Sequence, residues 1–135
     1  MKTLKQIFII FSVGLLVWSC SSSSIKNKRI HKEKPVVIAN DSLEYEIIII
    51  DIGFNLYLNT VAKPAGFYSQ NYLENKNIFY VFEWNNRVRN PQSYNPNIYE
   101  NTIEYNQNID YGYDVNYKLY NYFKFAQQKY HMKLR

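Results

Sequence analysis

The chain has one thiol, and that thiol closes an apolar run. Lys2 and Lys5 precede the uncharged stretch 7–18, and the motif 17–20 ends in Cys20 with a serine before it. A basic head, an apolar run and a small residue before a cysteine are typical of a secretory signal peptide that ends in a lipidation motif. We therefore expect residues 1–19 to be a signal peptide and Cys20 to carry acyl chains such as palmitate, which anchor the protein to a membrane.

One residue keeps an alternative to lipidation open. Trp18 stands where lipidation motifs commonly have a small residue, so ordinary secretion with cleavage near Ser19 is the competing interpretation. A permanent transmembrane helix is disfavoured, because the apolar run 7–18 is shorter than the roughly 20 residues that a bilayer requires.

Few other side chains could support nucleophilic or zinc chemistry. A Ser-His-Asp arrangement needs a histidine in a formed pocket, and a zinc site needs three or four nitrogen or sulfur ligands. The two histidines are His31, in a polar linker, and His131, in a C-terminal tail that we expect to be frayed. We expect no cofactor and no metal. An intrachain disulfide is impossible, because Cys20 is the only cysteine.

Carboxylates are the remaining catalytic candidates, since glycan-cleaving enzymes place two of them around the bond that breaks. Glu74 and Glu83 would lie on opposite sides of one helix. No Lys or Arg occurs between Arg89 and Lys118, so the four acidic residues of that stretch could cluster: Glu100, Glu104, Asp110 and Asp114. Simple solubility of a tyrosine-rich segment is the favoured interpretation.

The same stretch departs from a calcium loop. An EF-hand has Asp first, Gly sixth and Glu twelfth. Here these positions hold Asn106, Tyr111 and Tyr117.

Tyrosine is abundant, with 14 copies. An exposed row of tyrosines could stack on sugars or grip an extended peptide, because the ring is apolar and its tip is polar. The members that we expect to be exposed lie off the apolar stripe of the last helix: Tyr111, Tyr113, Tyr117 and Tyr120. The favoured interpretation is structural, with the rings covering the edges of a small core.

The net charge of +5 does not describe the globular part. Residues 35–135 carry nine Lys or Arg against ten Asp or Glu, and the excess of positive charge lies in the signal peptide and in the linker 20–34. Nucleic-acid binding requires a basic face on the domain, so we expect no nucleic-acid partner. The basic linker could instead meet anionic lipid headgroups, or it could be a solvated spacer.

Residues 35–135 are expected to form a single globular domain. Residues 35–40 suggest an edge strand, and 43–51 a second strand whose β-branched second half is buried on both faces. Residues 54–63 suggest a short helix, and the stretch 98–105 a further strand.

Two longer helices carry clear apolar stripes. Ser69 is a predicted N-cap for a helix to about residue 89, with Glu83 and Arg87 spaced to pair; a strand over 78–82 is the alternative. Residues 113–130 predict the second helix. The fold class is therefore α+β, with a small antiparallel sheet of two to three strands packed by two or three helices.

Several motifs also resemble a known group of proteins. They are Asp51-x-Gly-Phe54, Tyr68-Ser-Gln-x-Tyr-Leu-Glu-Asn75, Glu83-Trp-Asn-x-Arg-Val88, Asn95-Pro-x-x-Tyr-Glu100, Ile109-Asp-Tyr-Gly112 and Val115-Asn-Tyr-x-Leu-Tyr-Asn-Tyr-Phe123. Together they resemble a family of short, uncharacterised Bacteroidota lipoproteins with a domain of unknown function, although Ile52 stands where that family would have proline. The resemblance implies lipidation and an envelope location, and no activity.

These observations favour a non-enzymatic envelope lipoprotein on the periplasmic face of the outer membrane. Its partners would be the membrane, through the lipid anchor, and another envelope protein. The alternative is a periplasmic glycan- or peptidoglycan-binding module that uses exposed tyrosines, and the third hypothesis is a hydrolase with a carboxylate site.

Overall fold

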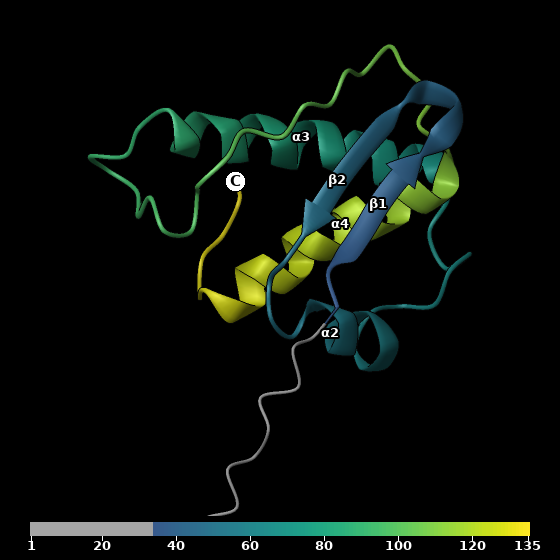
Figure 1. The fold of residues 1–135 in the computed structure, drawn as a ribbon, viewed down its shortest axis with the longest axis horizontal. Helices are drawn as coiled ribbons and strands as arrows, with labels where there is room; N and C mark the ends of the chain where they lie inside the picture. Colours follow the sequence, from purple (N-terminus) through teal and green to yellow (C-terminus); the bar gives the residue numbers. More distant parts are fainter. Residues whose placement is uncertain (1–33) are drawn as a thin grey trace, which may run out of the picture. The chain divides into compact units, whose positions relative to one another are not determined.

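The computed structural model describes residues 34–135, so the signal peptide, Cys20, His31 and nearly all of the linker lie outside the described residues. The elements follow one another as β1 (Val36–Asn40), η1 (Asp41–Leu43), β2 (Tyr45–Ile49), α2 (Phe54–Thr60), α3 (Gln70–Val88) and α4 (Gly112–Lys129). A two-stranded antiparallel sheet lies over α4, with α3 beside it (Figure 1). The predicted α+β fold class is confirmed.

The hairpin is formed by polar turn residues. The Asn40 side chain accepts a hydrogen bond from the Ser42 amide at 3.1 Å, and Glu44 adopts the left-handed conformation, with a φ of 50°. Because asparagine bonds readily to backbone two residues on, it favours a turn here. The turn sets the register, in which Val36 lies opposite Ile49 and Asn40 opposite Tyr45.

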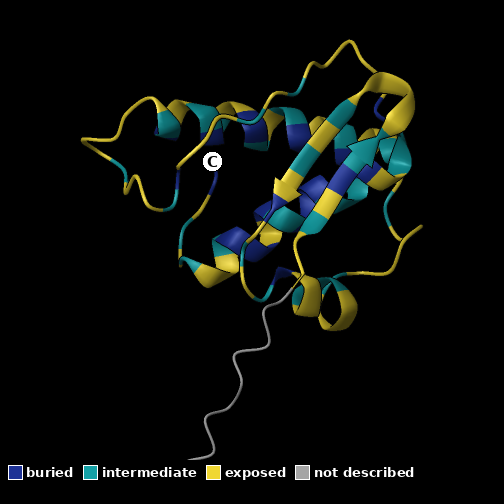
Figure 2. Cartoon of the chain, in the orientation of Figure 1, coloured by how far each residue is buried: buried dark blue, intermediate teal, exposed yellow. Residues whose placement is uncertain are grey.

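The expectation that the second half of 43–51 is buried on both faces is wrong. Ile48 is 55% exposed, Ile50 is 73% exposed, and the strand ends at Ile49. The described chain covers one face of the sheet with helices, so exposed residues alternate with less exposed ones along β2, and on β1 the exposed Val37 precedes the buried Ile38 (Figure 2). The hairpin therefore leaves Val37 and Ile48 exposed on its outer face.

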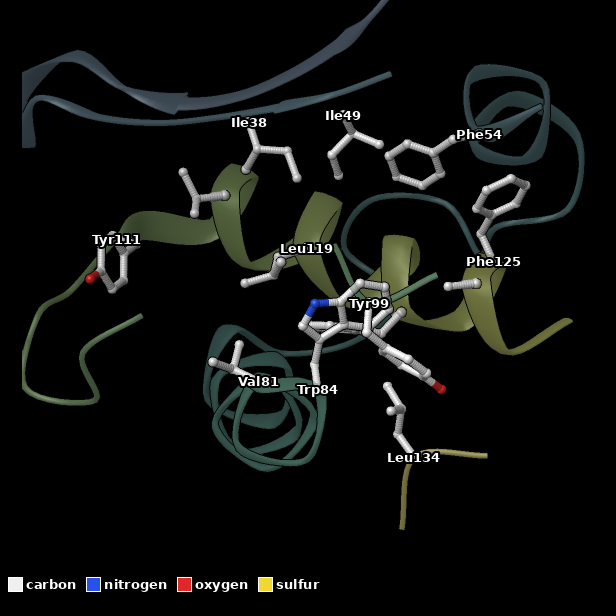
Figure 3. Packing of buried hydrophobic residues seen from close by; sticks show 13 residues of the cluster. Ile38, Ile49, Phe54, Val81, Trp84, Tyr99, Tyr111, Leu119, Phe125 and Leu134 are labelled. Carbon is white, nitrogen blue, oxygen red and sulfur yellow. The ribbon is translucent and has the colours of Figure 1, made fainter. Parts of the chain in front are cut away.

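The core lies between the inner face of the sheet, α2, α3 and α4. Ile38 and Ile49 point from the sheet toward Leu119 of α4. Val81 and Trp84 enter the same core from α3 (Figure 3). The buried apolar residues of α3 and α4 recur at helical spacing, so the predicted apolar stripes are the buried faces.

The start of α3 agrees with its sequence signal. The Ser69 side chain accepts a hydrogen bond from the Tyr72 amide at 3.3 Å, as an N-cap does. Residues 78–82 are helical, so the alternative strand is wrong.

The predicted strand over 98–105 is also wrong. Among the described residues the sheet has two strands, and this segment is irregular. Its backbone bonds instead to side chains of α3: the Trp84 indole donates to the Asn101 carbonyl at 3.0 Å, and Asn85 bonds Ile103. An extended segment needs backbone partners, and here α3 supplies them.

The C-terminal tail is fixed, contrary to the expectation that it frays. Leu134 is buried, and its amide donates to the Gln127 side chain at 3.1 Å. Arg87, only 9% exposed, donates to the Lys133 carbonyl at 2.5 Å and to the Tyr99 hydroxyl at 2.8 Å. The predicted pair with Glu83 is present at 2.9 Å.

A buried guanidinium requires several partners. Burial lowers the pKa of Arg87, but its bonds to Tyr99 and Glu83 outweigh that effect and raise the pKa above its ordinary value. The tail is thus held because the buried Arg87 guanidinium donates to the Lys133 carbonyl oxygen.

Within residues 34–135, every helix falls short of the length or apolar character that a membrane span requires.

Candidate functional site

The four tyrosines of the predicted row do not form one exposed surface. Tyr111 and Tyr120 are each only 5% exposed, so their expected exposure is wrong. The Tyr111 ring lies 4.4 Å from that of Tyr45 and 4.9 Å from that of Tyr105, measured between centroids. The ring therefore fills the space beneath one end of the sheet.

Tyr113 and Tyr117 are half-buried and hold the loop between α2 and α3. The Tyr113 hydroxyl accepts a hydrogen bond from the Gly66 amide at 2.6 Å, and the Tyr117 hydroxyl donates to the Lys63 carbonyl at 2.8 Å. Burial and, to a lesser extent, the neighbouring Tyr113 raise the pKa of Tyr117. Contact of these four tyrosines with a ligand stays a prediction.

The four carboxylates between Arg89 and Lys118 do not gather at one point. Asp110 accepts hydrogen bonds from the Gln70 side chain at 2.7 Å and from the Gly112 amide at 2.9 Å. Asp114 pairs with Lys118 at 2.7 Å. Across the described chain, no group of three His, Cys, Asp or Glu is arranged to hold a metal ion.

Glu100 and Glu104 do contribute to a site. They line a groove of about 690 Å³ between residues 44–51, which include β2, and the irregular segment 97–104. Trp84, Tyr122 and Tyr130 also line it. The groove therefore runs along the edge of β2 that faces away from β1.

Bonds on three sides define the groove. The Asn85 side chain donates to the Ile103 carbonyl at 2.8 Å and accepts from the Ile103 amide at 2.8 Å, which holds the segment to α3. At one end of β2, the Tyr45 hydroxyl donates to the Glu104 carbonyl at 2.8 Å. Past the other end, the Tyr130 hydroxyl donates to Asp51 at 2.9 Å.

The groove is acidic. Five carboxylates line it, and none of the described lining residues is Lys or Arg. Asp51 is paired with Lys129. The other four are exposed and take part in none of the ion pairs of the described chain: Glu44, Glu46, Glu100 and Glu104.

The phenols of the groove stay neutral at physiological pH. Burial and, to a lesser extent, the hydrogen bond to Asp51 raise the pKa of Tyr130 to about 12. Burial and, to a lesser extent, the charge of Asp51 also raise the pKa of Tyr122. Both phenols therefore remain neutral at physiological pH.

Sequence reasoning located part of this site and missed its geometry. The absence of Lys and Arg between residues 89 and 118 marked one wall as acidic, and Glu44 with Glu46 were visible on one strand. Nothing in the spacing of these residues indicates that segment 97–104 faces β2, because that placement depends on Asn85.

The fold and the groove define a class of protein: a small α+β domain in which a two-stranded sheet covers α4 and leaves one strand edge open to an acidic groove. By sequence, the chain belongs to a family of unknown function (DUF6146), which matches residues 7–135. No curated protein matches the chain significantly, and no solved structure does either.

Asn85→Ala tests the contact that holds the groove wall. It removes two hydrogen bonds to Ile103, so we expect the free energy of unfolding to fall by about 1–3 kcal/mol. Urea unfolding followed by circular dichroism measures the change. The matched control is Asn86→Ala, on the exposed side of the same helix, which should stay within about 0.5 kcal/mol of the parent. Equal losses in the two variants would show that Asn85 does not fix the segment.

Proposed function

We propose that this chain is a non-enzymatic lipoprotein of a Bacteroidota-type cell envelope whose domain binds another envelope protein. Cys20 carries the lipid, and the domain sits on the periplasmic face of the outer membrane. The observation that carries the binding role is the groove beside the open edge of β2.

The surroundings of the groove support a protein partner. An unpaired strand edge offers backbone donors and acceptors that another polypeptide can satisfy. Val37 and Ile48 lie opposite each other on the outer face of the sheet, and both are exposed. Apolar side chains beside unpaired backbone are suited to binding polypeptide.

The acidic residues support binding over hydrolysis. A carboxyl group that acts as general acid is kept protonated by burial or by a close like charge. Glu44, Glu46, Glu100 and Glu104 are all exposed, so none of them has the burial that such an acid needs. Their role is therefore electrostatic recognition.

The lipid anchor is tested with Cys20→Ser in full-length protein expressed in a host that lipidates envelope proteins. We expect labelled palmitate to enter the parent chain and to be absent from the variant. The parent should fractionate with membranes and the variant with soluble periplasm, while Ser22→Ala behaves as the parent. Palmitate label in Cys20→Ser, or a parent chain found only in the soluble fraction, would refute the anchor.

The partner is tested by placing a photo-crosslinking residue at Ile48 of the full chain in intact cells. Because Ile48 lies on the open edge, we expect one discrete adduct with an envelope protein after illumination. Phe82, exposed on α3 and not among the groove residues, is the matched position and should give no such adduct. An absence of discrete adducts at position 48, or equal adducts at both positions, would contradict the proposal.

A further inference from the structure

We propose that the groove receives an extended, lysine- or arginine-bearing segment of the partner, which pairs with the open edge of β2 as a third strand. This inference rests on the proposed function, since it names how the domain would bind its envelope partner. For this mode of binding, backbone N–H and C=O groups of β2 must face the groove. The β2 edge must also be more accessible than the β1 edge, and the charge of the groove must favour a cationic segment.

The direction of the backbone groups follows from a contact on β1. The Val37 carbonyl accepts a hydrogen bond from the Lys118 ammonium at 3.4 Å, and Lys118 belongs to α4. Val37 therefore directs its backbone groups away from β2. In an antiparallel pair, opposite residues alternate between hydrogen-bonded and non-hydrogen-bonded positions, which makes Val37 and Ile48 a non-hydrogen-bonded pair.

The backbone N–H and C=O of Ile48 consequently face the groove. The same alternation turns the backbone of Glu46 to the groove, whereas Ile47 and Ile49 bond to β1. Two residues that are two apart thus present donors and acceptors on the open edge. This is the pattern that an added strand pairs with.

The opposite edge of the sheet is protected. Lys118 lies against β1, and a lysine at an edge discourages pairing because a second strand would bury its charge. No lysine or arginine is among the described residues that line the groove at β2. The two edges of this small sheet therefore differ, and only the β2 edge admits another chain.

The length of the groove suits a short strand. Its wall on the β2 side runs from Glu44 to Asp51, which is enough for a partner strand of about five residues, the usual strand length. The Tyr45–Glu104 and Tyr130–Asp51 bonds stand near the two ends of that wall. The partner segment would lie between these bonds.

The charge of the groove selects the sequence of the segment. Opposite charges on directly facing strands stabilise pairing, and like charges destabilise it. Glu46 lies on β2, and Glu100 and Glu104 lie on the facing wall, so a cationic segment would meet carboxylates on both sides. The stems of Lys or Arg could also cover the exposed Ile48.

The test measures binding of a ten-residue peptide of alternating Lys and Thr to the full chain in detergent micelles, with alternating Glu and Thr as the counter-probe. We expect the Lys peptide to bind and the Glu peptide not to bind. Ile48→Pro removes the groove-facing N–H and leaves the ladder to β1 intact, so it should weaken binding about tenfold. Val37→Pro, the residue directly opposite, should change the affinity less than about twofold.

A second pair of variants separates charge from backbone pairing and serves if a proline variant does not fold. Glu46→Gln with Glu104→Gln should weaken binding of the Lys peptide about tenfold, whereas Asp41→Asn, exposed and outside the groove, should leave it unchanged. Equal losses for the prolines, unchanged binding in the double glutamine variant, or binding of the Glu peptide would each overturn the inference.

The failure of this inference is distinguishable from the failure of the proposed function. A discrete adduct at position 48, together with no binding of the Lys peptide, would mean that the domain has a partner of another chemistry. The absence of a discrete adduct at position 48 would instead contradict the proposed partner itself.

Discussion

The side-chain amide of Asn85 imitates a neighbouring strand. It donates to the carbonyl of Ile103 and accepts from the amide of the same residue, both at 2.8 Å. These are the two bonds that a hydrogen-bonded partner in an antiparallel sheet would make. Because these bonds come from α3, the backbone of Ile103 does not pair with β2, and the edge of β2 stays open. The groove, its acidic wall and the proposed binding mode all depend on this exchange of partners.

The rest of the described chain is held by a comparable use of side chains on backbone. Arg87 fixes the tail through the Lys133 carbonyl, and Tyr117 fixes the loop after α2 through the Lys63 carbonyl. A domain of about a hundred residues without disulfides has a modest core. Long polar side chains that bind the backbone of distant segments therefore help to stabilise it, as cross-links would. This arrangement accounts for many of the tyrosines without assigning them ligands.

Local patterns sufficed for the parts of the fold that are set locally. The stripes of α3 and α4, the Ser69 cap and the Glu83–Arg87 pair follow from spacing along one helix. The strand over 98–105 was mispredicted because β-propensity cannot reveal that Asn85 lies near Ile103. The exposure of Tyr111 and Tyr120 was mispredicted because aromatic residues from other elements extend the buried surface of α4 beyond its apolar stripe. Within the site, the acidic character was predictable and the groove was not.

Amide hydrogen exchange of the free full chain tests the open edge most directly. If the edge is open, the amides of Glu46 and Ile48 exchange at nearly the rate of exposed backbone, while those of Ile47 and Ile49 are protected by β1. The alternation of fast and slow amides along β2 is the predicted result. Uniform protection of all four amides would mean that another segment already covers the edge, and it would contradict this account of the groove.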